Sequence, residues 1–160
     1  MIRRQIDGVL RNRLGEYPAV ALVGPRQSGK TTLAQAFGGL YFDLEQEPER
    51  LRLDLEWERI KQSQHLVILD EAQSWPEIFP RLRGVIDRDR RRMGRYLLLG
   101  SIAPSLMIRV SESLAGRLSL VELTPFLLGE LKTRPGPRES LWLNGGFPDG
   151  GVLESRRYPQ

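Results

Sequence analysis

The chain of 160 residues contains no cysteine and only one histidine, His65. The lack of cysteine excludes disulfide bonds, thiolate metal sites and a cysteine nucleophile. A single imidazole also excludes any site that needs two histidines, such as the zinc-binding helix of metalloproteases. The chemistry must therefore come from other side chains, and His65 is expected to have a structural role.

Long apolar runs are missing as well. The longest ones, such as residues 19–23 and 96–99, have the length of strands. They fall far short of the roughly 18 residues that a membrane span needs. The basic N-terminus is not followed by an apolar core, so no secretory signal is predicted. We expect a cytoplasmic protein with no membrane partner.

Lysine is scarce, since only Lys30, Lys61 and Lys132 are lysines among the 24 basic residues. The net charge of +4 permits an anionic partner without requiring one. Seven arginines and two aspartates lie between Arg81 and Arg95. The apolar residues of this segment fall on one helical face, so we expect the arginines to form the solvated side. Contact with DNA or RNA phosphates is the less favoured alternative.

Three runs are apolar at every position, namely residues 19–23, 66–69 and 96–99. Such strands are typical of a parallel sheet that is covered by helices on both faces. Weaker strand candidates lie at residues 41–42 and 118–123. Helical patterns separate or follow these strands, at residues 31–37, 49–61, 78–86, 104–110 and 125–131. The alternation predicts an α/β fold with a three-layer, doubly wound and mostly parallel sheet.

The length of the chain fits one domain with a short appendage. Residues 1–133 are expected to form this domain, and an amphipathic helix over residues 1–15 begins it. A stretch rich in proline and glycine predicts a linker at residues 134–138. Residues 139–160 are too few and too poor in apolar side chains to fold alone, so we expect a C-terminal stub.

One motif has a clear chemical meaning: the residues from Gly24 to Thr31 match G-x-x-x-x-G-K-[ST], between a predicted strand and a predicted helix. The glycines let the backbone turn tightly and approach an anion, and successive N–H groups then surround the phosphates. Lys30 is expected to reach the β- and γ-phosphates, and the Thr31 hydroxyl is expected to bind Mg²⁺. The residues expected to contact the nucleotide are Gly24, Pro25, Arg26, Gln27, Ser28, Gly29, Lys30, Thr31 and Thr32.

The apolar run at residues 66–69 ends in two carboxylates, Asp70 and Glu71. Asp70 is expected to bind Mg²⁺, and Glu71 is placed to orient and deprotonate an attacking water. The next predicted strand ends at Ser101, whose hydroxyl is expected to sense the γ-phosphate or to cap the strand. Together these residues predict binding of ATP and its Mg²⁺-dependent hydrolysis.

Several segments occur in an order that resembles a known family. They lie at residues 24–33, 41–45, 68–73, 99–101, 104–106, 113–117, 122–126 and 141–148, and they include Ser-Leu-Ala-Gly-Arg and Gly-Gly-Phe-Pro. The chain resembles the prokaryotic AAA-type ATPases of the AAA+ superfamily, whose full-length members carry a second domain after the ATPase core. The resemblance implies a P-loop NTPase fold of the AAA+ (ASCE) type, ATP and Mg²⁺ as cofactors, and hydrolysis coupled to a conformational change. It also implies a chain that stops after the ATPase core.

The resemblance further gives Arg117 a candidate role as an arginine finger or sensor at the γ-phosphate. A finger would act in trans, within a homo-oligomer, and an ordinary surface arginine is the alternative. Two other functions stay open. Residues 70–73 also match the DEAQ box of helicases, which indicates a nucleic-acid motor or loader, and a nucleotide-binding module that does not hydrolyse ATP is the third hypothesis.

Overall fold

A single parallel sheet forms the centre of the protein. The computed structural model describes residues 4–101, 112–131 and 145–148. Within these ranges the strand order is β2-β3-β4-β1-β5, and all neighbours are parallel. The strands are β1 (Ala19–Val23), β2 (Leu40–Asp43), β3 (Val67–Asp70), β4 (Tyr96–Gly100) and β5 (Leu118–Glu122). The predicted α/β fold is confirmed, and both weaker strand candidates are strands.

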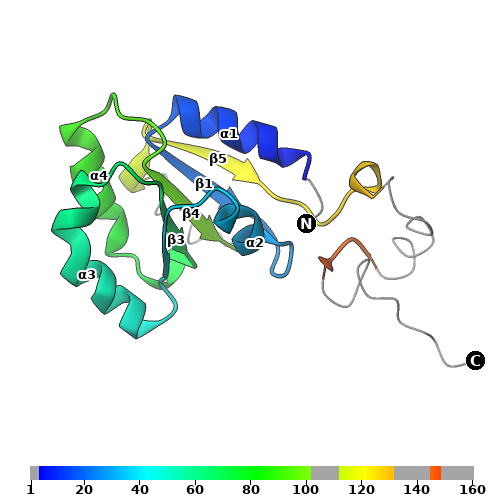
Figure 1. The fold of residues 1–160 in the computed structure, drawn as a ribbon, viewed down its shortest axis with the longest axis horizontal. Coiled ribbons are helices and arrows are strands. Elements are labelled where there is room, and N and C mark those ends of the chain that lie inside the picture. Colours follow the sequence, from blue (N-terminus) through cyan, green and yellow to red (C-terminus); the bar gives the residue numbers. More distant parts are fainter. Residues whose placement is uncertain (1–3, 102–111, 132–144, 149–160) are drawn as a thin grey trace, which may run out of the picture.

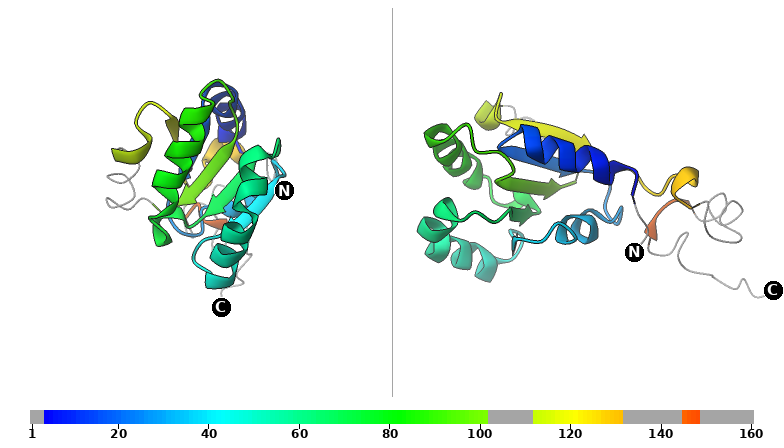
Figure 2. Two further views of the ribbon diagram at one scale, coloured as in Figure 1. Left: turned by 90° about the vertical axis from the view of Figure 1, so that its left-hand side faces the viewer. Right: turned by 45° about the horizontal axis from the view of Figure 1, so that its top comes forward.

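Helices cover both faces of the sheet and complete three layers (Figure 1; Figure 2). Four α-helices have both ends described: α1 (Ile6–Glu16), α2 (Lys30–Gln35), α3 (Glu47–Gln62) and α4 (Ile78–Arg88). Residues 112–114 are also helical. Helices α1 and α2 pack on one face, and α3 and α4 pack on the other. Two short 3-10 turns, η1 (Ala72–Ser74) and η2 (Leu128–Glu130), follow β3 and β5.

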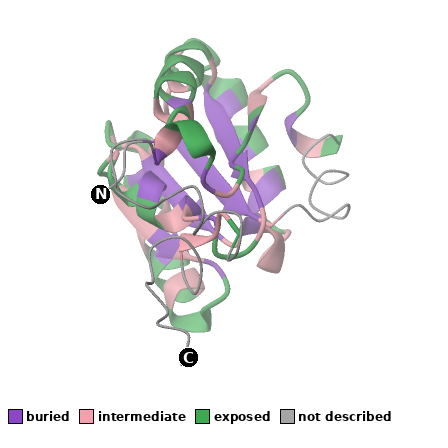
Figure 3. Cartoon of the chain, turned by 90° about the vertical axis from the view of Figure 1, so that its right-hand side faces the viewer, coloured by how far each residue is buried: buried purple, intermediate pink, exposed green. Residues whose placement is uncertain are grey.

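The interior strand β1, between β4 and β5, is buried along its whole length (Figure 3). Val20 and Leu22 pack with α1 and α2, whereas Ala21 and Val23 belong to the cluster beneath α3 and α4. Successive side chains of a strand point to opposite faces. A strand covered on both faces must therefore be apolar at every position, which explains the continuous apolar run that marks it in the sequence.

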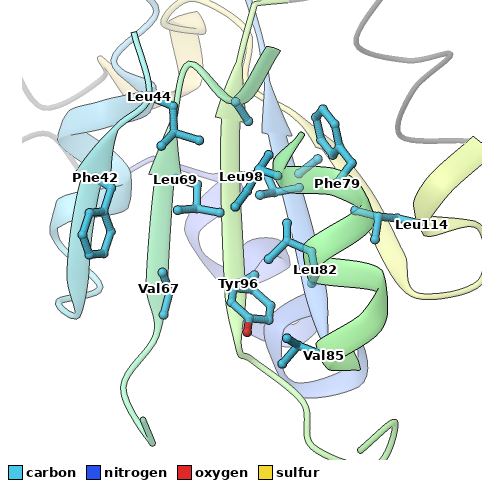
Figure 4. Close-up of a cluster of buried hydrophobic side chains, with 14 of the residues drawn as sticks. Phe42, Leu44, Val67, Leu69, Phe79, Leu82, Val85, Tyr96, Leu98 and Leu114 are labelled. Atoms are coloured by element: carbon cyan, nitrogen blue, oxygen red, sulfur yellow. The ribbon is translucent and has the colours of Figure 1, made fainter. Parts of the chain in front are cut away.

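The larger apolar cluster lies between the sheet and helices α3 and α4 (Figure 4). Phe42, Leu69 and Leu98 come from three adjacent strands, and Leu82 of α4 joins them; all four are almost completely buried. Burial of each such side chain contributes about 1.5–3 kcal/mol. This packing holds β2, β3 and β4 against one another and so fixes where their ends lie.

The carboxyl ends of the strands gather at one edge of the sheet. The register pairs Val23 of β1 with Gly100 and with Glu122, and it pairs Asp43 with Asp70. The loops that leave these strands therefore begin side by side, which is where parallel α/β sheets bind their ligands. The predicted phosphate loop, the acidic pair and Ser101 all start at this edge.

The helix predicted over residues 125–131 is wrong. Only the short turn η2 forms there. The Glu130 carboxylate accepts the Leu127 backbone N–H at 2.9 Å, which closes a tight turn. The Phe126 N–H donates to the Gly146 carbonyl at 2.6 Å. Leu127 has an extended backbone, with φ of −88° and ψ of 151°, so no regular helix extends through it.

Some predictions lie outside the described residues. They concern the helix at residues 104–110, the linker at 134–138, most of the stub at 139–160 and the first three residues of the helix at 1–15, whose described part begins at Ile6. The division of the chain into core, linker and stub therefore stays a prediction. In the described ranges, no helix is long and apolar enough to cross a membrane.

Candidate nucleotide-binding site

The predicted phosphate loop, residues 24–31, runs from the end of β1 into α2, and both of its glycines are required by the backbone. Gly29 has φ of 90° and stands at the start of α2, in the left-handed region that glycine enters without strain. A Cβ on Gly24 would lie 2.3 Å from the Leu123 carbonyl oxygen. Any other residue at this position would push the loop away from the end of β5. The sequence motif therefore also serves the packing of the sheet.

Lys30 points back into this loop. Its side chain is buried, with 6% exposure, and the ammonium donates to the carbonyls of Gly24 at 3.1 Å and Pro25 at 2.9 Å. Burial lowers the pKa of Lys30, against the opposing attraction of the Glu71 and Asp70 carboxylates. The buried cation is thus held between loop carbonyls and the acidic end of β3.

Asp70, at the end of β3, receives hydrogen bonds from three different parts of the chain. The Thr31 hydroxyl of α2 donates to its Oδ2 at 2.7 Å, and the Tyr41 hydroxyl of β2 donates to the same atom at 2.8 Å. The Glu71 backbone N–H donates to Oδ1 at 2.9 Å. The two residues predicted to bind Mg²⁺, Thr31 and Asp70, therefore lie in direct contact.

Tyr41 is a residue of this site that sequence reasoning did not single out. Burial raises its pKa, and its hydrogen bond to Asp70 acts in the same direction. The phenol therefore keeps its proton and acts as a donor to the carboxylate. Only the register of β2 beside β3 brings it there, since Tyr41 pairs with Ile68. No local pattern around Tyr41 carries this information.

Glu71 has a constrained backbone, with φ of 47° and ψ of 46° in the left-handed region. A non-glycine residue there is uncommon, and such conformations gather at functional sites. Its carboxylate accepts a hydrogen bond from the Gln73 side-chain amide of η1. The Gln73 contact holds the predicted base beside Asp70, at the carboxyl edge of the sheet.

Two buried polar atoms near these residues have no hydrogen-bond partner within the described part of the chain: Ser28 Oγ in the phosphate loop and Gln73 Oε1 after β3. Leaving such a group unpaired costs about 1–3 kcal/mol, and buried polar groups normally have a partner. A phosphate group fits the loop, because Ser28 Oγ would supply a free donor beside glycine backbone. The Thr31 hydroxyl and the Asp70 carboxylate are oxygen ligands of the type that Mg²⁺ prefers.

Comparison with known proteins agrees with this geometry. Residues 16–132, most of the chain, match the AAA domain family. The chain belongs to the AAA domain family. The resemblance found in the sequence is thereby confirmed as an AAA-type P-loop ATPase fold with an ATPase-like, nucleotide-binding core.

Two curated relatives of this AAA domain are uncharacterized proteins of Mycobacterium bovis and Mycobacterium tuberculosis. Each is 40% identical over 150 residues, which cover 91% of this chain and 33% of the relative. The chain thus spans about a third of the length of the curated relatives it matches. Among solved structures, a Walker-type ATPase of Pyrococcus abyssi is similar, with a TM-score of 0.67 and 18% identity over 92% of this chain and 65% of that one. At this identity the similarity concerns the fold.

Of the other residues predicted for the site of this AAA domain, most lie at or beside the phosphate loop, and Arg117 does not. Ser101 directly follows β4, whose last residue, Gly100, accepts the Gly24 N–H at 3.3 Å. Ser101 therefore lies next to the beginning of the phosphate loop. Arg26 and Gln27 are exposed at the loop, and Thr32 is exposed on α2.

Arg117 is not part of this group. It precedes the first residue of β5, at the amino end of the sheet, whereas the phosphate loop follows the last residue of the parallel strand β1. A strand of five residues separates the two ends by about 16 Å. The Arg117 guanidinium instead donates two hydrogen bonds to Asp87 of α4, at 2.8 and 3.0 Å. Arg117 therefore does not reach the phosphate loop of its own chain.

Several arginines of the basic segment from Arg81 to Arg95 form ion pairs or hydrogen bonds within the AAA domain. Arg81 pairs with Asp54, Arg90 pairs with Asp87, and the Arg92 guanidinium donates to the Ser63 carbonyl. Arg95 is buried and donates to the carbonyls of Val85 and Lys61. The apolar side of α4 faces the sheet, as predicted. Nucleic-acid binding by this segment stays the less favoured prediction.

Proposed function

We propose that this AAA domain binds ATP with Mg²⁺ at the carboxyl edge of its sheet and hydrolyses it. One observation carries the proposal: the Thr31 hydroxyl of the phosphate loop meets the Asp70 carboxylate of β3 at 2.7 Å. A hydroxyl from the loop and a carboxylate from a neighbouring strand end are the two protein groups that P-loop ATPases use to hold Mg²⁺ beside the phosphates. Their convergence supports nucleotide binding better than either motif alone.

The loop residues would bind and orient the phosphates. Lys30 now donates to two loop carbonyls, and phosphate oxygens would be stronger acceptors for a buried ammonium. The unpaired Ser28 hydroxyl and the N–H groups at the start of α2 would add neutral donors. Mg²⁺, held by Thr31 and Asp70, would neutralise charge on the phosphate oxygens.

Glu71 would accept the proton of the attacking water. Glu71 directly follows Asp70, so both carboxylates lie at the carboxyl edge of the sheet. Asp70 would bind the metal, and Glu71 would bind the water. The Gln73 amide orients Glu71. Ser101, beside the loop, would sense the γ-phosphate. Arg117 would serve as an arginine finger only toward the loop of a second copy of the chain.

A matched pair of lysine variants tests the proposal. Lys30→Ala should weaken ATP binding at least about tenfold, because it removes a charge-assisted donor to the phosphates. Lys61→Ala is the control, since Lys61 lies on α3 and its ammonium pairs with Glu58 of the same helix. Titration calorimetry with Mg²⁺-ATP measures both affinities. Equal ATP affinity in wild type and Lys30→Ala would refute the assignment.

Turnover separates this function from its rivals. We expect phosphate release from ATP that rises more than linearly with protein concentration if Arg117 acts in trans. Tight ATP binding with no release at high protein concentration would instead favour a module that does not hydrolyse ATP. Stimulation of the release by DNA, lost at high salt, would favour a nucleic-acid motor.

A further inference from the structure

Arg4 is buried behind the phosphate loop and is bound there through all three nitrogens. Its exposure is 7%. Nη1 donates to the Ser28 carbonyl at 3.0 Å, Nη2 to the Thr124 carbonyl at 2.7 Å, and Nε to the Glu130 carboxylate at 3.1 Å. The guanidinium also lies 4.3 Å from the centre of the Phe126 ring. We call Arg4, Ser28, Thr124, Phe126 and Glu130 the Arg4 junction.

The acidic partner in the Arg4 junction is held as firmly as Arg4 itself. The Glu130 side chain is 3% exposed. Besides the bond from Arg4, its carboxylate accepts the backbone N–H of Gln5 at 2.7 Å and that of Leu127 at 2.9 Å. Burial raises the pKa of Glu130, but these hydrogen bonds outweigh it and leave the pKa below its ordinary value. The carboxylate is therefore charged, and removal of either partner would leave a buried charge unpaired.

The contact with Ser28 fixes the orientation of one peptide group in the phosphate loop. The peptide bonds of the described residues are trans, so the Ser28 carbonyl and the Gly29 N–H point in opposite directions. While Arg4 binds that carbonyl from behind, the Gly29 N–H faces the other side of the loop. Gly29 precedes α2 in a left-handed conformation, and a glycine backbone can rotate more freely than that of other residues.

The Arg4 junction also contacts the last described segment, residues 145–148. The Phe126 N–H donates to the Gly146 carbonyl at 2.6 Å, and a Cβ on Gly146 would lie 2.5 Å from the Phe126 carbonyl oxygen. Pro148 approaches to 3.9 Å of the point where a Cβ on Gly29 would stand. Segments that are distant in sequence thus meet behind the loop, on the side of the sheet where α1 begins (Figure 1).

We propose that Arg4 is a positioning residue that sets the phosphate loop for its ligand and couples it to residues 124–130 and 145–148. The proposal rests on the nucleotide binding proposed above. Arg4 need not touch the nucleotide, because it acts through the Ser28–Gly29 peptide. Coupling is reciprocal, so bound nucleotide must tighten the Arg4 junction as much as the junction tightens nucleotide binding.

Substitution of Arg4 tests the first half of this coupling. Arg4→Met should weaken Mg²⁺-ATP binding about tenfold, and Arg4→Lys, which keeps the charge but loses the planar fork, should weaken it about threefold. Arg11→Met is the matched control. Arg11 also pairs with a carboxylate, Asp7, and lies over an aromatic ring, Phe37, but its side chain is exposed and these partners lie outside residues 24–31. Its ATP affinity should change less than about twofold.

Hydrogen exchange of the Phe126 and Leu127 amides tests the second half of the coupling, namely whether bound nucleotide tightens the Arg4 junction. Saturating Mg²⁺-ATP should slow their exchange in the wild type and in Arg11→Met, but not in Arg4→Met. If Arg4→Met fails to fold, Arg4→Lys and Glu130→Gln keep the shape of the junction and decide the matter through the same measurements.

The two proposals fail in different ways. A wild-type protein that binds no nucleotide would refute the function and this inference with it. Normal ATP affinity and normal amide protection in Arg4 variants that are merely less stable to heat would overturn the inference alone.

Discussion

The two edges of the sheet treat their polar groups differently. At the carboxyl edge Lys30 and Asp70 are buried; Lys30 donates to the Gly24 carbonyl, and Asp70 accepts from the Thr31 hydroxyl. Two buried atoms there, Ser28 Oγ and Gln73 Oε1, have no partner within the described residues. At the amino edge Arg95 donates to two carbonyls, and Arg117 forms a two-point contact with Asp87.

This difference shows how a candidate binding site can be distinguished from structural polar contacts within one small domain. At the amino edge the Arg117 and Asp87 charges pair with each other, and Arg95 is bonded to backbone carbonyls, so the polar groups named there already have partners. Buried, partly unsatisfied groups at the carboxyl edge cost stability in the free protein, and a ligand would recover that cost. Ser28 Oγ and Gln73 Oε1, which lack a partner within the described residues, therefore indicate the position of a ligand site better than the many arginines do.

The largest expected effect comes from Glu71. Glu71→Gln should slow ATP hydrolysis by about 10²–10⁴-fold, because an amide cannot accept the proton of the attacking water. ATP affinity should remain close to that of the wild type. A steady-state assay of phosphate release measures the rate, and Glu77→Gln, at an exposed carboxylate before α4, is the control. Normal turnover in Glu71→Gln would remove the role of general base.

A smaller effect is expected from Ser28→Ala, which should weaken ATP binding without lowering the stability of the free protein. ATP binding should weaken about fivefold through the loss of one donor, while the free energy of unfolding without ligand should stay constant or rise by about 1 kcal/mol. Ser63→Ala is the comparison, because the Ser63 hydroxyl already accepts the His65 N–H, and its loss should lower stability. Urea unfolding and calorimetry supply the two numbers. A Ser28→Ala protein that is clearly less stable would contradict the contrast between the edges.

The smallest effects belong to the pair at the amino edge. Hydrogen bonds from Arg117 lower the pKa of Asp87, so the contribution of this exposed pair to stability is present at neutral pH and is lost as the pH falls through that lowered pKa. Salt should weaken the contribution further.

Arg117→Ala should leave ATP affinity unchanged and should lower turnover only at protein concentrations where chains associate. A loss of turnover at every dilution would point to a role within the single chain.

Much of the site could be predicted from the sequence because its chemistry is locally encoded. Gly24, Gly29 and Lys30 follow one strand directly, and Asp70 and Glu71 follow another. In a parallel sheet the carboxyl ends of strands lie at one edge, so strand assignment alone was enough to bring these residues together. The contact between Thr31 and Asp70 follows from the same rule.

Residues that join the site from elsewhere could not be found this way. Tyr41 reaches Asp70 only through the register of β2 beside β3, and Arg4 reaches Ser28 only because α1 packs along β1 and β5. The helix predicted at residues 125–131 failed for a related reason. Leu127 is extended there, and the preceding Phe126 N–H is bonded to the distant Gly146 carbonyl, which periodicity does not reveal.

The sequence by itself determined the fold class, the phosphate loop and the acidic strand end, because each depends on neighbours along the chain. The tertiary structure alone decided which groups donate to Asp70, that the Arg4 guanidinium bonds to the Ser28 carbonyl, and that Arg117 lies at the opposite edge of the sheet. The physical reason is that hydrogen bonds between distant segments depend on strand order, register and helix packing, and these follow from burial of the whole core rather than from any local pattern.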